Sequence, residues 1–201
     1  MGVIIAASRN KHKLKEMDAI LEKFDMEIIS RDNAGVEKFE IIEDGNTFEE
    51  NSYKKAYEIH KITKESTIAD DSGLMVDFLN GEPGVYSARY SGEGATDEDN
   101  NSKLLKLLEN VSDENRTAKF VSVITLIFKN GDELVARGEC KGEILKNPIG
   151  ENGFGYDPLF MPEGYDKSFA QLSDIEKNKI SHRAKALMKL EKLLSERRKE
   201  I

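Results

Sequence analysis

The chain has 201 residues, of which 38% are hydrophobic and 34% charged, a balance typical of a globular protein with a buried core and a charged surface. Its net charge of −8 argues against a nucleic-acid partner, because nonspecific binding to polynucleotides needs a basic surface. No apolar stretch reaches the length of a membrane span and no secretory signal is visible, so we predict no membrane partner and a cytoplasmic location. The single cysteine, Cys140, excludes an intrachain disulfide and lies in a strand-like segment, which predicts a buried or half-buried thiol.

The first part of the chain alternates predicted strands and helices, as α/β proteins do. Residues 2–8 form an apolar segment that predicts a strand, and apolar residues at helical spacing over 14–24 predict the helix after it. A second strand is predicted over 26–30. This order places a strand-to-helix turn near residue 8.

A capping box of Thr47 and Glu50 predicts the start of the next helix, which ends near His60. Short apolar segments then predict strands over 66–70 and 74–78. The alternation of strand and helix therefore continues to this point.

The middle of the chain has a different pattern. Thr96 is the predicted N-cap of a leucine-rich helix. Two long β segments follow, over 118–128 and 133–145, and Asn130-Gly131 between them is a strong hairpin signal. A purely doubly wound sheet does not accommodate this hairpin, so we predict an elongated mixed β-sheet flanked by helices.

The last part contains a glycine-rich loop over 150–157 and a helical region over 180–194. Ser173 and Glu176 form another capping box, and Ser181 is a candidate cap for the final long helix. Because no internal repeat or interdomain linker appears, we predict a single domain over 1–201.

The segment Ala69-Asp70-Asp71-Ser72-Gly73-Leu74 carries the strongest chemical signal. It predicts a buried strand that delivers Asp70 and Asp71 to its C-terminal end, where a turn begins. A Mg²⁺ ion on phosphates takes few protein carboxylates and completes its shell with water and substrate oxygens. A solvated Asp-Asp turn explains this segment equally well when it is considered alone.

The turn after the first strand is a candidate phosphate site. Free backbone N–H groups and the positive end of a helix dipole favour an anion there. Ser8 and Asn10 supply hydrogen-bond donors and Lys13 a positive charge. The same residue types also serve as ordinary helix caps and solvated lysines, so this pattern has a structural alternative.

The acidic segment over 40–45 precedes the helix capped by Thr47. One of its acids is a candidate third ligand beside Asp70 and Asp71. The alternative is that these acids only complement the helix dipole. Lys54 and Lys55 on that helix are interpreted by default as surface residues.

The loop over 150–158 combines three glycines with Phe154, Tyr156 and Asp157. Glycines allow the backbone to approach a ligand closely, and an aromatic ring can stack on a nucleotide base. A structural turn with core aromatics is the alternative. His182 and Arg183 at the start of the last helix have a structural interpretation by default, and together with this loop they are candidates for recognising a base carbonyl.

Taken together, these segments resemble the inosine-triphosphate pyrophosphatase family in the family's order over almost the whole chain. Six motifs carry the resemblance: Ser8-x-Asn10-x-x-Lys13, Gly45-x-Thr47-Phe48-x-Glu50-Asn51, Ala69-Asp70-Asp71-Ser72-Gly73-Leu74, Pro83-Gly84-Val85-Tyr86-Ser87-Ala88-Arg89-Tyr90, Gly153-Phe154-Gly155-Tyr156-Asp157-Pro158 and Ser181-His182-Arg183. The departures are mild. Ser8 replaces a common threonine and keeps its hydroxyl, and Arg9 replaces a frequent glycine.

The resemblance implies hydrolysis of noncanonical purine nucleoside triphosphates (ITP, dITP, XTP) to the monophosphate and pyrophosphate. It also implies a fold of two lobes around a central cleft and a homodimer. Mg²⁺ would be bound by Glu43 and Asp71 with Asp70 close by, and Asp71 would also be the general base. Residues implied to bind substrate are Ser8, Asn10, Lys13 and Lys55 at the triphosphate, Ser72 beside it, and Phe154, Gly155, Tyr156, Asp157, Lys177, His182 and Arg183 at the base.

Two other functions remain open at this point. One is a pyrophosphatase of the septum-inhibitor type, acting on pyrimidine or modified nucleotides, although that family has an arginine-rich motif that residues 8–11 fit poorly. The other is a nucleotide-binding or sensor protein without catalysis. The acids Glu43, Asp70 and Asp71 argue against it, because binding alone does not need a metal-and-base cluster.

Overall fold

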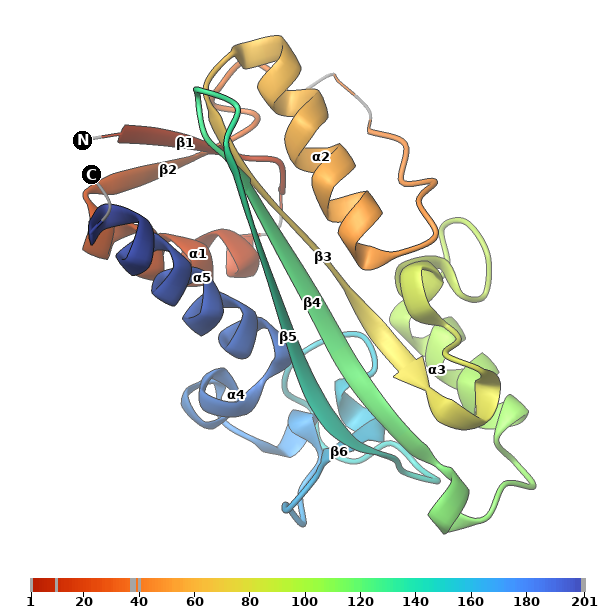
Figure 1. Ribbon diagram of the computed structural model, residues 1–201. Coiled ribbons are helices and arrows are strands. Elements are labelled where there is room, and N and C mark those ends of the chain that lie inside the picture. Colours follow the sequence, from red (N-terminus) through yellow and green to blue (C-terminus); the bar gives the residue numbers. More distant parts are fainter. Residues whose placement is uncertain (1, 10, 37–38, 40, 200–201) are drawn as a thin grey trace. The chain divides into compact units, whose positions relative to one another are not determined.

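A computed structural model describes residues 2–9, 11–36, 39 and 41–199. Its strands form a six-stranded sheet in the order β2-β1-β3-β4-β5-β6, with helices beside it (Figure 1). The chain divides into two compact units: unit 1 comprises residues 1–71, 122–138 and 186–201, and unit 2 comprises 72–121 and 139–185. The described helices and strands are β1 (Gly2–Ala6), α1 (Lys11–Leu21), β2 (Met26–Ser30), α2 (Phe48–Thr63), β3 (Ser66–Val76), α3 (Asp97–Leu107), β4 (Thr117–Ile127), β5 (Glu133–Ile144), β6 (Phe160–Pro162), α4 (Asp174–Ile180) and α5 (His182–Lys199).

Unit 1 contains the parallel part of the sheet. β1 pairs in parallel with β2 on one side and with β3 on the other, where Ala6 lies opposite Ile68. The chain passes through α1 between β1 and β2, and through α2 before β3. The carboxyl end of β1 therefore lies at the point where the strand order reverses, beside the middle of β3, and open α/β sheets bind ligands at such a point.

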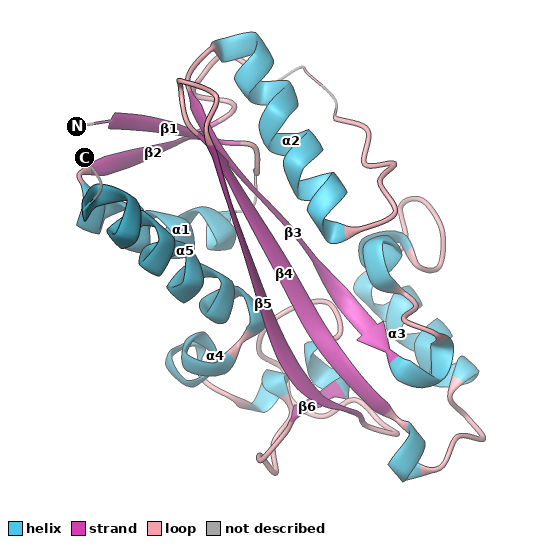
Figure 2. Cartoon of the chain, in the orientation of Figure 1, coloured by secondary structure: helices cyan, strands magenta, loops and turns pink. Residues whose placement is uncertain are grey.

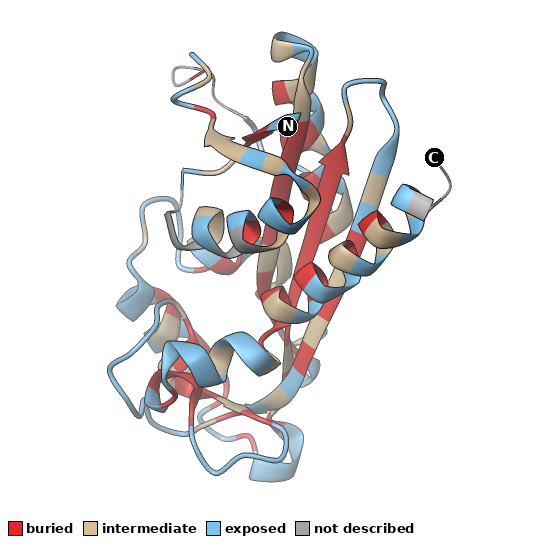
Figure 3. Cartoon of the chain, turned by 90° about the vertical axis from the view of Figure 1, so that its left-hand side faces the viewer, coloured by how far each residue is buried: buried red, intermediate tan, exposed pale blue. Residues whose placement is uncertain are grey.

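The helices of unit 1 cover both faces of these strands. Ile4 and Ala6 pack in one apolar cluster with residues of α1 and α5. Ile5 packs in a second cluster with Ala56 and Ile59 of α2. Because successive strand residues point to opposite faces, α1 and α5 lie on one face and α2 on the other (Figure 2). α5 turns a buried stripe toward the strands and exposed residues outward (Figure 3), as an amphipathic helix does.

Unit 2 has its own apolar core around an aromatic cluster. The ring centroids of Phe120 and Phe160 are 4.7 Å apart, and those of Phe160 and Phe169 are 5.0 Å apart. Leu104 and Leu108 from the α3 segment are fully buried in the same core. This packing anchors the antiparallel pair of β5 and β6 and the segment that follows it.

Most predicted elements are confirmed, including the mixed α/β sheet flanked by helices. Thr47 caps α2 and Thr96 caps α3, each in a full capping box. The hairpin turn at Asn130-Gly131 joins β4 and β5, with Gly131 at φ 89°. The prediction of one domain over 1–201 stays a prediction beside the observed division into two units.

One prediction about the strands is wrong. Residues 66–70 and 74–78 are not two strands separated by a turn at Ser72-Gly73, because β3 continues without a break from Ser66 to Val76. The Asp-Asp-Ser-Gly sequence is typical of turns, yet every residue of β3 is buried or half-buried, and packing on both faces overrides local propensity. β6, a strand of three residues, was missed because so short a segment has no periodicity.

None of the described helices combines the length and the apolar character needed to cross a bilayer.

Cys140 is 3% exposed in β5, and burial raises the pKa of its thiol. The prediction of a buried thiol is thus confirmed. Because the thiolate is the reactive form, we expect a maleimide at pH 7.5 to label the native protein roughly 100-fold more slowly than the urea-unfolded chain. Mass spectrometry of timed samples measures both rates, and equal rates would contradict the packing of β5 described here.

Candidate active site

β3 places its two aspartates on opposite faces of the sheet. Asp70 follows the register of Ile68, which packs on the α1 and α5 side, and Asp71 follows that of Ala69, which packs on the α2 side. Both lie beyond Ile68, the last residue of β3 that pairs with β1. The prediction that the strand delivers both acids to its C-terminal end is therefore wrong. Asp70 and Asp71 lie in the middle of β3, just past the carboxyl end of β1.

On the α2 side, Lys55 joins Asp71 to Glu43. Its ammonium Nζ lies 2.7 Å from Asp71 Oδ1 and 3.2 Å from Glu43 Oε2. Lys55 is 9% exposed, so its default interpretation as a surface residue is wrong. The four-carbon stem of this lysine is covered by the helix-sheet contact while its charge meets the acids.

The charges of this cluster do not balance. Burial alone would lower the pKa of Lys55, but the negative charges of Asp71 and Glu43 outweigh it and the pKa is raised. The pKa of Asp71 is also raised, by burial first and by the charges of Glu43 and Asp70, against the opposing effect of Lys55. Among the described contacts of this cluster one ammonium faces two carboxylates, so negative charge is in excess there, which favours a further cation.

Asp71 also has an oxygen available for that cation. Its Oδ2 is buried, and no residue in the described part of the chain donates a hydrogen bond to it. A buried carboxylate oxygen without a partner is costly, so a water or a metal ion fits there. The described residues contain no group of three or more His, Cys, Asp or Glu arranged to hold a metal. Two carboxylates nevertheless suit Mg²⁺, which usually keeps several waters and binds substrate phosphates.

On the opposite face, Asp70 is held by groups from α1 and β4. Its Oδ1 accepts a hydrogen bond from Lys13 of α1, and its Oδ2 accepts one from Ser122 of β4 at 3.1 Å. Ser8 follows the end of β1 and is half-buried, close in sequence to the N-terminus of α1. Asn10 lies outside the described residues. The structure thus brings Lys13 and Asp70 together beside the turn predicted to bind phosphate.

In unit 2, the glycine-rich loop is organised by Asp157. This residue is 2% exposed, and its Oδ2 accepts hydrogen bonds from the Phe154 backbone N–H at 2.9 Å and from Lys177 at 2.5 Å. Gly153 adopts φ 79°, and a Cβ there would collide with the Asp157 carboxylate. The Phe154 ring is half-exposed, with the Lys177 ammonium 5.1 Å from its centroid. An exposed ring beside a cation is suited to stacking on a planar base.

Hydrogen bonds to residues outside the loop fix Gly155 and Tyr156. Tyr156 is buried and its hydroxyl donates to the Ser87 carbonyl at 2.8 Å, and burial raises the pKa of this phenol. The Gly155 N–H donates to Asp97 at 2.7 Å, and the Gly155 carbonyl accepts from Asn101 at 2.9 Å. Tyr156 therefore acts as an anchor, while Phe154 remains accessible.

The start of α5 lies in unit 2 with this loop. The His182 ring stacks on Phe120 at 4.8 Å between centroids with a 14° interplanar angle. His182 and Arg183 are 7% and 5% exposed, and Ser181 caps the helix by accepting from the Ala184 N–H. Burial of both residues fits their structural interpretation and also fits a pocket wall that offers donors. Their predicted role at the base stays a prediction, as does that of Ser72, which follows Asp71 in β3.

Three buried polar residues of unit 1 that hold the segments beside the acids were not predicted to have this role. Ser122 holds Asp70, Ser52 bonds the Ala69 carbonyl at 3.2 Å, and Asn51 bonds the Gly45 N–H at 2.8 Å. All three are fully buried. A polar residue within a buried strand or on the apolar face of a helix is the signal that would have identified them, because such groups need partners.

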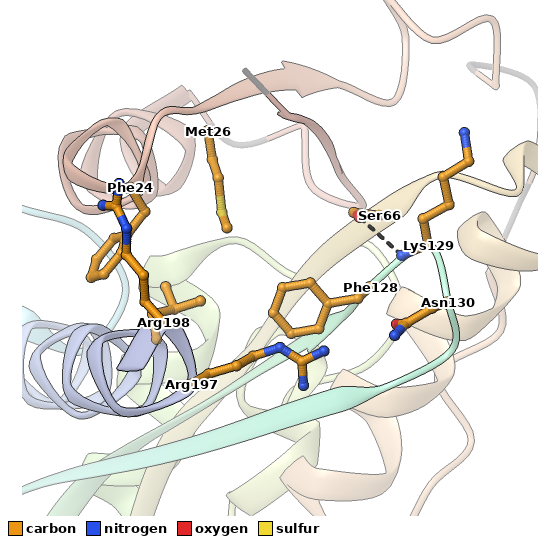
Figure 4. Close-up of a pocket in the computed structure, with 9 residues that line it drawn as sticks. Phe24, Met26, Ser66, Phe128, Lys129, Asn130, Arg197 and Arg198 are labelled. Carbon is orange, nitrogen blue, oxygen red and sulfur yellow. Dashed lines mark hydrogen bonds between the residues drawn. The ribbon is translucent and has the colours of Figure 1, made fainter. Parts of the chain in front are cut away.

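A cavity of about 440 Å³ in unit 1 lies elsewhere and contains none of the predicted site residues (Figure 4). Its two arginines are paired, Arg197 with Asp132 and Arg198 with Asp25, and Arg197 also stacks on Phe128. Ser66 at its wall precedes Asp71 by five residues of β3, which is about 16 Å along a strand. We therefore place the candidate site at the acids and not in this cavity.

Comparison with known proteins gives consistent matches. A model of the Ham1 family matches residues 4–193. A dITP/XTP pyrophosphatase of Clostridium perfringens is 50% identical over 196 residues, covering 94% of this chain and 96% of that protein. The Ham1 protein of Staphylococcus aureus superposes with a TM-score of 0.90 at 42% identity, covering 97% of this chain and 99% of that one. A nucleoside-triphosphatase / dITP/XTP pyrophosphatase of Mycobacterium abscessus gives a TM-score of 0.80 at 45% identity, over 94% and 98% of the two chains.

The buried pair of Asp157 and Lys177 leads to a stability prediction. Asp157→Ala leaves the Lys177 ammonium and the Phe154 N–H without their acceptor, so we expect a loss of about 3 kcal/mol in unfolding free energy. Asp157→Asn keeps one acceptor and should lose about half as much. Urea denaturation followed by circular dichroism measures both.

Glu151→Gln is the matched control, because Glu151 is an exposed acid of the same loop and its loss should stay within about 0.5 kcal/mol. Equal stability of the Asp157→Ala and Glu151→Gln variants would contradict the organising role of Asp157.

Proposed function

The chain belongs to the Ham1 family, and from this membership we propose that it hydrolyses noncanonical purine nucleoside triphosphates to the monophosphate and pyrophosphate. ITP, dITP and XTP are the substrates we assign to it. The family confirms the resemblance drawn from the six sequence motifs. The observation that carries the proposal is the acidic cluster of Glu43, Lys55 and Asp71, with a buried Asp71 oxygen that lacks a donor among the described residues.

The phosphates are assigned to the turn between β1 and α1. Ser8 and Asn10 supply polar side chains, Lys13 supplies a charge, and the N-terminus of α1 supplies free backbone N–H groups. Asp70 supports this role, because its buried carboxylate bonds Lys13 and so fixes the lysine beside the turn. Lys55 and Ser72 complete the set of groups assigned to the triphosphate end of the substrate.

Glu43 and Asp71 are the residues that would hold Mg²⁺, whereas Asp70, the third acid of the prediction, points to the other face of the sheet and bonds Lys13 and Ser122. The two carboxylates that face one lysine among the described contacts and the available Asp71 oxygen support this assignment. When bound there, the ion would neutralise charge on the phosphates during transfer. Its shell would be completed by water and phosphate oxygens, because Mg²⁺ keeps such ligands readily.

Asp71 is the proposed general base. It would take a proton from a water that attacks the α-phosphorus in line, and the bond to the β-phosphate would break with release of pyrophosphate. Lys55 keeps the carboxylate in place by bonding the other oxygen.

Unit 2 offers the groups assigned to the base. Phe154 would stack on the purine, with Gly155, Tyr156 and Asp157 as the loop that presents it. Lys177, His182 and Arg183 are hydrogen-bond donors, and a 6-oxo group accepts from donors. Adenine presents a 6-amino donor at the same edge, so the donors would remain unpaired against it, which is a costly mismatch.

The two alternative functions receive less support. Relatives named dITP/XTP pyrophosphatase, matched over nearly the whole chain, favour purine triphosphates over the substrates of the septum-inhibitor type. A sensor without catalysis would have no use for a charge-imbalanced acidic cluster at the carboxyl end of β1. The homodimer and the cytoplasmic location stay predictions that the resemblance and the composition support.

The proposal is tested by release of pyrophosphate from ITP, XTP, dUTP and ATP with Mg²⁺. We expect ITP and XTP to be hydrolysed much faster than the others. Asp71→Asn keeps the shape of the side chain but removes the base, so we expect kcat to fall by roughly 10²–10⁴-fold while circular dichroism shows that the protein stays folded.

Asp18→Asn is the control, because Asp18 is an exposed acid on α1 and should leave kcat unchanged. Preference for dUTP in the screen would favour the septum-inhibitor type. Turnover of the Asp71→Asn variant within tenfold of wild type would remove the base assignment of Asp71.

Arg183 tests the base assignment. Arg183→Ala should lower kcat/KM for ITP by roughly 10- to 100-fold, the value of a hydrogen bond to a charged donor, and lower it much less for ATP. The ITP-to-ATP ratio should therefore shrink. Steady-state kinetics with both nucleotides, together with melting curves, measure this.

Lys185→Ala is the control, because Lys185 is an exposed cation in the first turn of α5. It should leave the ITP-to-ATP ratio unchanged. A purely structural Arg183 would lower both activities in parallel with stability, and the base pocket would then have to be sought elsewhere.

A further inference from the structure

Asn51 is a fully buried amide on α2 that the proposed reaction does not use. It is 0% exposed. Its Oδ1 accepts a hydrogen bond from the Gly45 N–H at 2.8 Å, which fixes the orientation of the amide. Its Nδ2 has no acceptor in the described part of the chain. A buried amide with half its hydrogen-bonding capacity unused costs free energy, so its presence calls for a compensating role.

The contact with Gly45 is close. A Cβ on Gly45 would lie 2.7 Å from Asn51 Oδ1 and 2.8 Å from Glu50 Cβ. No side chain fits between the loop and the helix at this place. The backbone two residues after Glu43 is therefore pressed against the first turn of α2 and held there by the Asn51 amide.

The first two turns of α2 hold residues 43–47 of the loop before it. The contacts are Lys55 to Glu43, Lys54 to Asp44, Asn51 to Gly45, and Glu50 to the N–H groups of Asn46 and Thr47. Asp44 and Lys54 form an exposed pair of little energetic value. Within this set, the Asn51 contact alone is made by a fully buried side chain of the described helix. Asn51 is therefore the firmest attachment of the loop to α2.

Asn51 and Lys55 are also four residues apart on α2, and residues at this spacing share one helix face. Lys55 bonds Glu43 directly, whereas Asn51 bonds the backbone that carries Glu43. Lys55 also contacts Asp71. The same helix face thus sets the position of both carboxylates assigned to the metal.

We propose that Asn51 is a positioning residue for the metal site: its Oδ1 holds Gly45 and thereby places Glu43 opposite Asp71. This rests on the proposed function for the identity of the metal site, but not on catalysis. Groups that orient metal ligands typically change metal affinity by roughly 10- to 100-fold when they are removed. A merely structural asparagine would change stability without changing metal affinity.

The test uses Mn²⁺ as the probe, because electron paramagnetic resonance counts the free ion without any substrate. Asn51→Leu removes the acceptor, and we expect Mn²⁺ to bind roughly 10- to 100-fold more weakly to the nucleotide-free protein. Asn51→Asp keeps an oxygen toward Gly45 and adds a negative charge near the acids, so we expect it to bind Mn²⁺ at least as tightly as wild type does. We expect the Mg²⁺ concentration for half-maximal ITP hydrolysis to rise in Asn51→Leu and not to rise in Asn51→Asp.

Ser52→Ala is the matched control. Ser52 is the next residue and is equally buried, and it bonds the Ala69 carbonyl and Thr125 rather than the acidic loop. It should lower the melting temperature as Asn51→Leu does and leave Mn²⁺ affinity unchanged. Gly45→Ala disrupts the same contact from the side of the loop. If Asn51→Leu does not fold, Gly45→Ala takes its place in the test, and we expect it to weaken Mn²⁺ binding.

Two results would overturn the proposal. One is an Asn51→Leu variant, or a Gly45→Ala variant in its place, that melts earlier but binds Mn²⁺ as wild type does. The other is an Asn51→Asp variant as weak in Mn²⁺ binding as Asn51→Leu. Failure of the proposed function would appear differently, as wild-type protein that binds Mn²⁺ and hydrolyses neither ITP nor XTP.

Discussion

The ion pair of Lys55 with Asp71 and Glu43 is the interaction on which the site in unit 1 depends. A buried lysine is costly unless carboxylates meet it, and here two of them do. The pair fixes α2 against β3 and holds the acidic loop to both. Because one ammonium faces two carboxylates among the described contacts, the cluster differs from a simple one-to-one salt bridge. The cluster stabilises the fold only in part. The second carboxylate keeps a negative charge that Lys55 does not neutralise, which is the electrostatic condition for binding a further cation.

The alternation of a β-strand separates the roles of the two adjacent aspartates. Asp71 points to the α2 side and enters the acidic cluster, whereas Asp70 points to the other side and meets Lys13 and Ser122. A turn would have allowed both carboxylates to converge on one ion. In the continuous strand, Asp71 instead keeps an oxygen without a donor among the described groups, while Asp70 fixes a lysine beside the start of α1.

The sequence predicted the elements wherever a cap or a period was explicit. The Thr47 and Thr96 capping boxes and the Asn130-Gly131 hairpin all lie where predicted, because these signals are local. The continuity of β3 was not predictable, since Asp-Asp-Ser-Gly is a turn sequence that only packing on both faces overrides. Burial of Lys55 was missed for the same reason: its partners come from β3 and from the loop before α2, and no local pattern records them. The candidate residues were found mainly through motif resemblance, and their contacts came only from the structure.

The cap of α2 connects these observations. Thr47 starts the helix at a fixed residue through its bonds with Glu50, and each residue of an α-helix turns the next by about 100°. A helix that began one residue later would rotate Lys55 away from Asp71, and Asn51 away from Gly45, by more than a quarter turn. The position of Glu43 beside Asp71 is therefore set by the register of this helix as well as by β3, and the cap determines that register.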